Sequence, residues 1–169
     1  MPEPIYTSAE ALAHPTGAAA AIKDGRQFYT TSKLVNILWS NACARYLIES
    51  HSQITINAFD PGLMPGTGLG REYNGAVEKF MWYRLMPRIL PLLRLVVSPN
   101  IHSPKESGEA LAWVATSKDT KGITGKYFEL KKEIPSSAVT YEVEKQNDIW
   151  NWTVEETTRG IENFFNFKV

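Results

Sequence analysis

Residues 28–39, FYTTSKLVNILW, are the stretch around which the rest of the chain is organised. They place Tyr29 and Lys33 four residues apart at the start of a long apolar run. On an α-helix this spacing puts the phenol and the ammonium on one face, about one turn apart. A neighbouring ammonium favours the phenolate and lowers the pKa of a tyrosine. Such a tyrosine can exchange a proton with a substrate oxygen near neutral pH.

The same spacing recurs at Tyr127 and at Tyr141, each with a lysine four residues on, so the context has to choose among three pairs. Tyr127 lies in GKYFEL, which is typical of a β-strand, where residues four apart are separated by about 13 Å. Tyr141 opens a mostly polar helix near the C-terminus. Only the pair at Tyr29 leads through an apolar helix into a strand and a Pro-Gly loop, and it is therefore the catalytic candidate.

Length and composition limit the class of protein. The chain has 169 residues, which fit a single domain, and its 18 basic and 18 acidic side chains cancel. A balanced overall charge gives no reason to expect a nucleic acid or an anionic membrane as partner. The single cysteine, Cys43, excludes an internal disulfide and fits a reducing, cytoplasmic compartment. The first residues have neither the basic nor the apolar region of a signal peptide.

Hydrophobic periodicity predicts helices that alternate with strands. Helices are expected after a cap at Ser8 and over residues 30–50, 103–116 and 140–158, and strands over residues 54–59 and 122–130. Residues 131–138 are expected to form a loop. The helix 30–50 is apolar on more than one side, so we expect it to be buried on two sides, for instance against a sheet and against a second subunit, and the oligomeric state stays open.

The loop after the first strand, residues 61–75, contains five glycines. Its Gly66, Gly68 and Gly70 do not form the dinucleotide fingerprint, because Arg71 stands where that pattern needs a glycine and no first strand of a βαβ unit precedes it. A loop at the carboxyl end of a strand is nevertheless where α/β sheets place their ligands.

Residues 76–97 form the most hydrophobic stretch of the chain. Four basic side chains exclude a membrane-spanning helix, and Pro87 and Pro91 divide the stretch into short helices. Three interpretations stay open: a pair of core-packing helices, which is preferred, a lid over a bulky apolar substrate, and a surface that rests on a membrane interface.

The ordered set of motifs resembles the short-chain dehydrogenase/reductase family. The set consists of Tyr-x-x-Ser-Lys on a helix, the strand ITINAF, Asp-Pro-Gly and a threonine a few residues on. PGLMPGTGL, PKESGEALAWVA and GITGKYFEL are more narrowly similar to the protochlorophyllide-reductase-like branch. This resemblance implies an α/β fold, namely the last two strands and flanking helices of a doubly wound, Rossmann-type parallel sheet. It also implies that the dinucleotide-binding N-terminal half belongs to a longer reading frame.

The resemblance further implies an NAD(P)(H)-dependent oxidoreductase that reduces a carbonyl or activated alkene of a fairly large apolar substrate, with NADP preferred over NAD. Tyr29 would donate the proton, and Lys33 would lower its pKa and bind the nicotinamide ribose. The loop would contact the nicotinamide carboxamide and the cofactor's amide or phosphates through Pro61, Gly62, Leu63, Met64 and Thr67.

Some family features have no counterpart in this chain. The Gly-rich turn, the acidic residue that reads the ribose and the catalytic serine are missing, and Leu63 stands where tetrapyrrole reductases carry a cysteine. The alternative function is therefore a non-catalytic remnant or interaction module that cannot bind a dinucleotide on its own. A small-molecule substrate, a homo-oligomer through helix 30–50 and a membrane-surface contact through residues 76–97 are the expected partners. No metal site is expected, because the three histidines are scattered.

Overall fold

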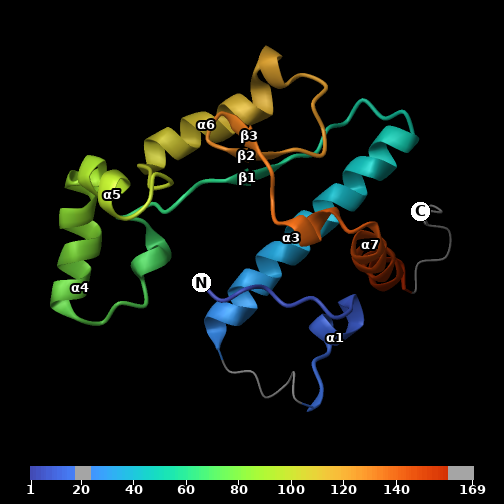
Figure 1. The fold of residues 1–169 in the computed structure, drawn as a ribbon, viewed down its shortest axis with the longest axis horizontal. Coiled ribbons are helices and arrows are strands. Elements are labelled where there is room, and N and C mark those ends of the chain that lie inside the picture. Colours follow the sequence, from blue (N-terminus) through green and yellow to red (C-terminus); the bar gives the residue numbers. More distant parts are fainter. Residues whose placement is uncertain (18–23, 160–169) are drawn as a thin grey trace. The chain divides into compact units, whose positions relative to one another are not determined.

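The computed structural model describes residues 1–17 and 24–159 (Figure 1). The chain forms two compact units, which are described separately. Unit 1 contains residues 1–58, 122–126 and the chain from Pro135 onward, and unit 2 contains residues 59–121 and 127–134. The sequence predicts a single domain over residues 1–169, and the division into two units does not test that prediction.

Unit 1 is helical. Its elements are α1 (Ala9–Ala13), α3 (Gly25–Glu49), a 3₁₀ turn (Ala138–Tyr141) and α7 (Val143–Thr158). The hydroxyl of Ser8 accepts a hydrogen bond from the N–H of Ala11 at 3.2 Å, which confirms the predicted cap. α3 begins earlier than predicted, because the Asp24 carboxylate caps it by accepting from the Arg26 N–H at 2.9 Å.

The core of unit 1 lies where α3 packs on α7, with α1 beside them (Figure 1). Ala9, Leu34, Leu38 and Ile149 are its buried members. Aromatic rings extend the contact, since the ring of Trp150 on α7 lies 5.5 Å from Trp39 and 5.7 Å from Tyr46 on α3. Helix α7 therefore covers the most deeply buried face of α3. Association of two copies through the helix predicted at 30–50 stays a prediction.

Unit 2 holds most of a mixed three-stranded sheet in the order β1-β2-β3. The strands are β1 (Ala58–Asp60), β2 (Tyr127–Glu129) and β3 (Lys132–Ile134). β2 and β3 are antiparallel, with Phe128 opposite Glu133. The α/β class is confirmed, and the sheet with its helices is compatible with part of a Rossmann-like fold.

The prediction of a loop over 131–138 is wrong, because β3 turns back on β2 after only two residues, Leu130 and Lys131. Leu130 adopts a φ of 51° there. Two-residue hairpin turns are recognised by Gly, Asn or Asp at such left-handed positions, and Leu-Lys carries no such signal.

The first predicted strand, 54–59, is shorter than expected. Only its last two residues enter β1, which ends at Asp60. Before β1, side chains bond to the neighbouring segment: the Ile56 N–H donates to the Thr124 hydroxyl at 3.0 Å, and the Asn57 amide donates to the Ile123 carbonyl at 2.9 Å. They accompany two backbone hydrogen bonds, from the Gly125 N–H to the Ile56 carbonyl and from the Ala58 N–H to the Lys126 carbonyl, both at 2.8 Å.

The hydrophobic stretch 76–97 is divided into short helices, as its prolines predict (Figure 1). α4 (Ala76–Phe80) continues through a π-helical turn (Met81–Leu85) and a 3₁₀ turn (Met86–Arg88) into α5 (Leu90–Val96). Within this fully described segment only Trp82 is buried, whereas Val77 and Leu95 expose 75% and 84% of their surface. Core packing is therefore the wrong interpretation for most of the segment. Over residues 1–17 and 24–159, no helix is long and apolar enough to span a membrane.

Helix α6 (Pro104–Thr116) follows in unit 2 and begins where its sequence predicts. The Ser103 hydroxyl accepts from the Glu106 N–H, and the Glu106 carboxylate accepts from the Ser103 N–H, which completes a capping box. Ser107 and Ala110 are buried on the inner face of the helix. The first turn of α6 thus lies at a defined place beside the loop that follows β1.

Candidate functional site

The Tyr29 and Lys33 side chains lie one turn apart near the start of α3, as predicted. The Lys33 ammonium nitrogen lies over the Tyr29 ring, 5.4 Å from its centroid. Both side chains are exposed, and Tyr29 shows 48% of its surface. Among the described residues no acidic side chain forms an ion pair with Lys33. Unit 1 therefore presents a phenol and an ammonium together at its surface, where a second molecule can reach both.

The competing Tyr–Lys pairs serve other purposes. Burial, together with the carboxylate charges of Asp60 and Glu129, raises the pKa of Tyr127 to about 12, which is opposite to what a proton donor near neutral pH needs. The Tyr141 hydroxyl accepts from the Ser136 N–H at 3.0 Å, and so it supports the chain before α7. The sequence context therefore favours Tyr29 and Lys33, and in the structure these two side chains are exposed to solvent.

The loop after β1 is held by a chain of polar side chains that we call the Asp60 network. One Asp60 carboxylate oxygen accepts from the Gly62 N–H at 2.8 Å, and the other accepts from the Asn100 side-chain amide at 2.9 Å. The Asn100 amide oxygen lies 3.0 Å from Nε2 of His102. His102 is buried, so the network anchors the loop to the interior of unit 2.

Backbone bonds reinforce the Asp60 network. The Leu63 N–H donates to the Asn100 carbonyl, and the His102 N–H donates to the Leu63 carbonyl, both at 2.9 Å. The buried Ser107 hydroxyl of α6 donates to the Pro61 carbonyl at 2.7 Å. As a result, the N–H of Leu63 is already engaged, although the sequence predicts that this part of the loop contacts a nicotinamide.

Gly62 is required by both its backbone angle and its surroundings. Its φ is +69°, and a Cβ there would lie 2.3 Å from the Asn100 amide oxygen and 2.6 Å from Cδ2 of His102. Any other residue would therefore be strained and would displace the network.

The glycine-rich remainder of the loop packs on Trp82. The buried Trp82 indole donates to the Thr67 carbonyl at 2.9 Å, and a Cβ on Gly70 would lie 2.3 Å from Cδ1 of that indole. The Thr67 hydroxyl donates to the Met64 carbonyl at 2.8 Å. These contacts show that Gly70 permits close packing, in agreement with the rejection of a dinucleotide fingerprint here.

The predicted site residues divide between the two units. Tyr29 and Lys33 belong to unit 1, whereas Pro61, Gly62, Leu63, Met64 and Thr67 belong to unit 2, and each group is described within its own unit. Sequence reasoning missed the residues that support the loop, namely Trp82, Asn100, His102 and Ser107. No short motif links Asp60 to an amide 40 positions away. The tripeptide Asn100-Ile101-His102 matches no known motif, so it did not indicate that its side chains support the loop.

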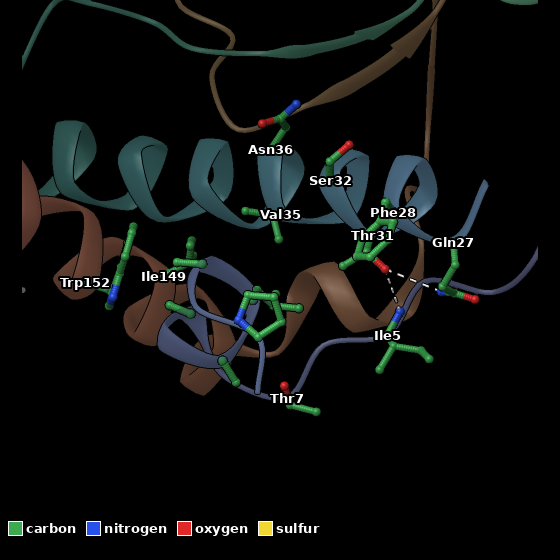
Figure 2. Close-up of a pocket in the computed structure, with 15 residues that line it drawn as sticks. Ile5, Thr7, Gln27, Phe28, Thr31, Ser32, Val35, Asn36, Ile149 and Trp152 are labelled. Atoms are coloured by element: carbon green, nitrogen blue, oxygen red, sulfur yellow. Dashed lines mark hydrogen bonds between the residues drawn. The ribbon is translucent and has the colours of Figure 1, made fainter. Parts of the chain in front are cut away.

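A separate cavity of about 460 Å³ lies in unit 1 among α1, α3 and α7 (Figure 2). From α3, Phe28, Thr31 and Val35 line it at the spacing of one helix face. The Thr31 hydroxyl accepts from the Ile5 N–H at 3.1 Å at its edge (Figure 2). Tyr29 and Lys33 are not among the lining residues, so this cavity is distinct from the catalytic candidate. In the described part of the chain, no cluster of His, Cys, Asp and Glu could hold a metal ion.

The donor set of the site fits a nicotinamide cofactor in unit 1 and only partly in unit 2. An exposed ammonium beside an exposed phenol can donate to ribose hydroxyls and to a substrate oxygen. In unit 2, the Leu63 N–H and the Thr67 hydroxyl already donate within the loop. The Leu63 carbonyl oxygen and the Thr67 hydroxyl oxygen still have lone pairs that can accept a hydrogen bond from a carboxamide N–H.

Comparison with known proteins reveals similarity to dehydrogenases. Short-chain dehydrogenase TIC 32 B of Brassica napus is 27% identical over 135 residues, which cover 77% of this chain and 36% of that protein. Retinol dehydrogenase 14 of Mus musculus is 30% identical over 79% of this chain and 35% of its own length. Polyprenol dehydrogenase of Homo sapiens is 28% identical over 76% and 35%, respectively. No family model matches the chain.

The names of these relatives support the short-chain dehydrogenase/reductase family for the stretch that matches them. The chain spans about a third of the length of the curated relatives it matches.

Proposed function

We propose that this chain is the catalytic and substrate-binding part of an NAD(P)(H)-dependent short-chain dehydrogenase/reductase. The observation that carries the proposal is the exposed Tyr29–Lys33 pair on α3. The similarity to dehydrogenases over more than three quarters of the chain supports it. The C-terminal portion of a doubly wound parallel sheet is the fold that we propose for these residues within the whole enzyme.

The chemistry assigns one task to each side chain of the pair. The Tyr29 phenol donates its proton to the substrate oxygen during reduction and takes it back during oxidation. The Lys33 ammonium stabilises the phenolate that this transfer leaves and can donate to the ribose hydroxyls of the cofactor. The bound nicotinamide supplies or accepts the hydride.

We further propose a fairly large apolar alcohol or carbonyl compound as substrate. Two relatives are named for retinol and for polyprenol, which are apolar alcohols. Exposed apolar side chains in α4 and α5 support this choice. NADP is the proposed form of the cofactor. Membership of the protochlorophyllide-reductase-like branch rests on the motifs PGLMPGTGL and GITGKYFEL, and Leu63 argues against protochlorophyllide itself as substrate.

The test is turnover of retinal or a polyprenal with NADPH by the full-length gene product. Tyr29→Phe removes the transferable proton, and we expect it to lower kcat by about 10²–10⁴-fold. Tyr141→Phe is the matched control, because Tyr141 has the same lysine spacing and a structural contact only. Full turnover by the Tyr29 variant would refute the proposed role.

A second candidate function is a non-catalytic interaction module that binds no dinucleotide. One observation favours it: the Leu63 N–H and the Thr67 hydroxyl both donate hydrogen bonds within unit 2, so these two donors are not available to a dinucleotide. Nicotinamide fluorescence distinguishes the two functions. We expect NADPH to bind the full-length product at micromolar concentration and to bind Lys33→Met more weakly. Folded protein, verified by circular dichroism, that does not bind NADPH would favour the module.

A further inference from the structure

The helical segment 76–97 of unit 2 exposes apolar side chains at helical spacing. In α4 these are Val77 and Phe80, three residues apart, and in α5 they are Leu92, Leu95 and Val96. Each exposes more than half of its surface. Each short helix therefore presents an apolar face that no other described residue covers, and the largest exposure, 84%, is that of Leu95. Apolar faces of this kind usually meet another apolar phase.

The charges of the segment identify the chemistry of that phase. The segment carries four cations and a single carboxylate, that of Glu78. Arg94 is paired with Glu106 at 2.6 Å, but in the described part of the chain Lys79, Arg84 and Arg88 form no ion pair. Three cations without an ion pair, beside exposed apolar side chains, complement a surface that has an anionic outer layer and an apolar interior.

Two of these cations frame a shallow hollow of about 470 Å³ with an aromatic ring. Phe80, Arg84, Leu85 and Arg88 line it. One guanidinium nitrogen of Arg88 donates to the Arg84 backbone carbonyl, and both arginines line the hollow. Guanidinium groups bind phosphate oxygens well, and the adjacent ring can lie among acyl chains.

We propose that residues 76–97 dock on the surface of an anionic phospholipid bilayer. Arg84, Arg88 and Lys79 contact headgroup phosphates and carboxylates, while the exposed faces of α4 and α5 enter the boundary between headgroups and acyl chains. The short helices lie on the bilayer and do not cross it, in agreement with their length. This docking is independent of the proposed reaction.

Flotation of the 169-residue chain with vesicles of phosphatidylcholine, with and without phosphatidylserine, tests the proposal. We expect the chain to float with the phosphatidylserine vesicles and to be released as the salt concentration rises. A basic residue near an anionic surface contributes about fivefold to partition, so the double variant R84A/R88A should bind roughly 25-fold more weakly. The double variant L95S/V96S should bind at least about tenfold more weakly, because it removes apolar area from the lipid contact.

Matched variants outside the segment control for charge and for exposed apolar area. Lys121→Ala with Lys131→Ala removes two exposed cations, and Ile48→Ser with Leu111→Ser removes two exposed apolar side chains. Both control pairs should float as the parent chain does, and circular dichroism should show that all four double variants keep their helices. The proposal is overturned if the parent chain does not float with the vesicles, or if its binding does not depend on phosphatidylserine. It is also overturned if the control pairs lose as much binding as the variants in the segment. Sedimentation that shows a dimer dissolved by L95S/V96S would identify a second copy as the occupant instead.

Discussion

At the scale of single residues, Gly62 carries the most information about the loop after β1. Its left-handed φ of +69° and the Asn100 amide oxygen, 2.3 Å from any Cβ, both require glycine. The same amide bonds Asp60 and His102, so a side chain at this position would break the Asp60 network as well as strain the backbone. The absence of a methyl group at Gly62 therefore leaves room for Asn100 to bond both Asp60, 40 positions earlier, and the nearby His102.

Replacement of Gly62 by alanine should therefore destabilise the chain. Left-handed backbone costs about 1–2 kcal/mol for a residue with a Cβ, and forcing a methyl group into filled space costs about 1–3 kcal/mol more. We expect Gly62→Ala to lower the free energy of unfolding by about 2–5 kcal/mol, measured by urea denaturation. Gly68→Ala is the control, because nothing lies within 4 Å of a Cβ there, and it should change stability by less than about 1 kcal/mol.

At the scale of elements, the start of α6 shows how a helix terminus sets the charge of a side chain. The backbone N–H and hydroxyl of Ser103, together with the Arg94 guanidinium, donate to the Glu106 carboxylate and lower its pKa from 4.5 to about 2. Because the pKa is lower in the folded state, the stabilisation is complete above about 4.5 and is lost as the pH falls towards 2.

This sign leads to a prediction for Glu106→Gln. The variant should be less stable at neutral pH, because a neutral amide accepts weaker hydrogen bonds from Ser103 and Arg94 than a carboxylate does, and it should lack the decline in stability between about pH 4.5 and pH 2 that we expect of the parent chain. The free energy of urea unfolding, measured across this pH range, reports the difference. Glu109→Gln removes a nearby exposed carboxylate that pairs only loosely with Lys105, at 3.8 Å, and should leave the pH profile unchanged.

The elements also show what the sequence can predict. The capping box at Ser103, the cap at Ser8 and the helix over most of α3 follow from residues within a few positions of one another, and all were predictable, although the start of α3 at Gly25 was not. The hairpin at Leu130 was missed because its turn lacks a glycine or asparagine. The contact between Asp60 and Asn100 was missed because the two residues meet only through tertiary packing, which no local pattern encodes.

At the scale of the whole molecule, the packing of unit 1 differs from the packing of segment 76–97 in unit 2. In unit 1, Leu38 is completely buried where α3 meets α7, and rings on both helices continue the contact. In unit 2, much of the apolar side-chain area of segment 76–97 stays exposed. Unit 1 therefore has a packed core around Leu38, whereas the apolar side chains of segment 76–97 are available for binding.

Leu38→Ala tests where that stability lies. Removing a fully buried leucine side chain costs about 2–5 kcal/mol, because the cavity that it leaves collapses only in part. We expect this loss in urea denaturation, together with faster hydrogen exchange of the α3 and α7 amides. Leu111→Ala is the control, because Leu111 exposes 50% of its surface and should cost less than about 1 kcal/mol. Equal losses from both variants would place the core of the chain elsewhere.

The contact between Trp82 and Gly70 also gives the loop an optical property. The indole is buried, packs against the backbone of the glycine-rich loop and donates to the Thr67 carbonyl. Its emission therefore depends on whether the loop stays in place, and it shifts to longer wavelength when water replaces the loop. A variant in which the other four tryptophans are replaced would therefore carry its own fluorescent reporter of any ligand or surface that moves this loop.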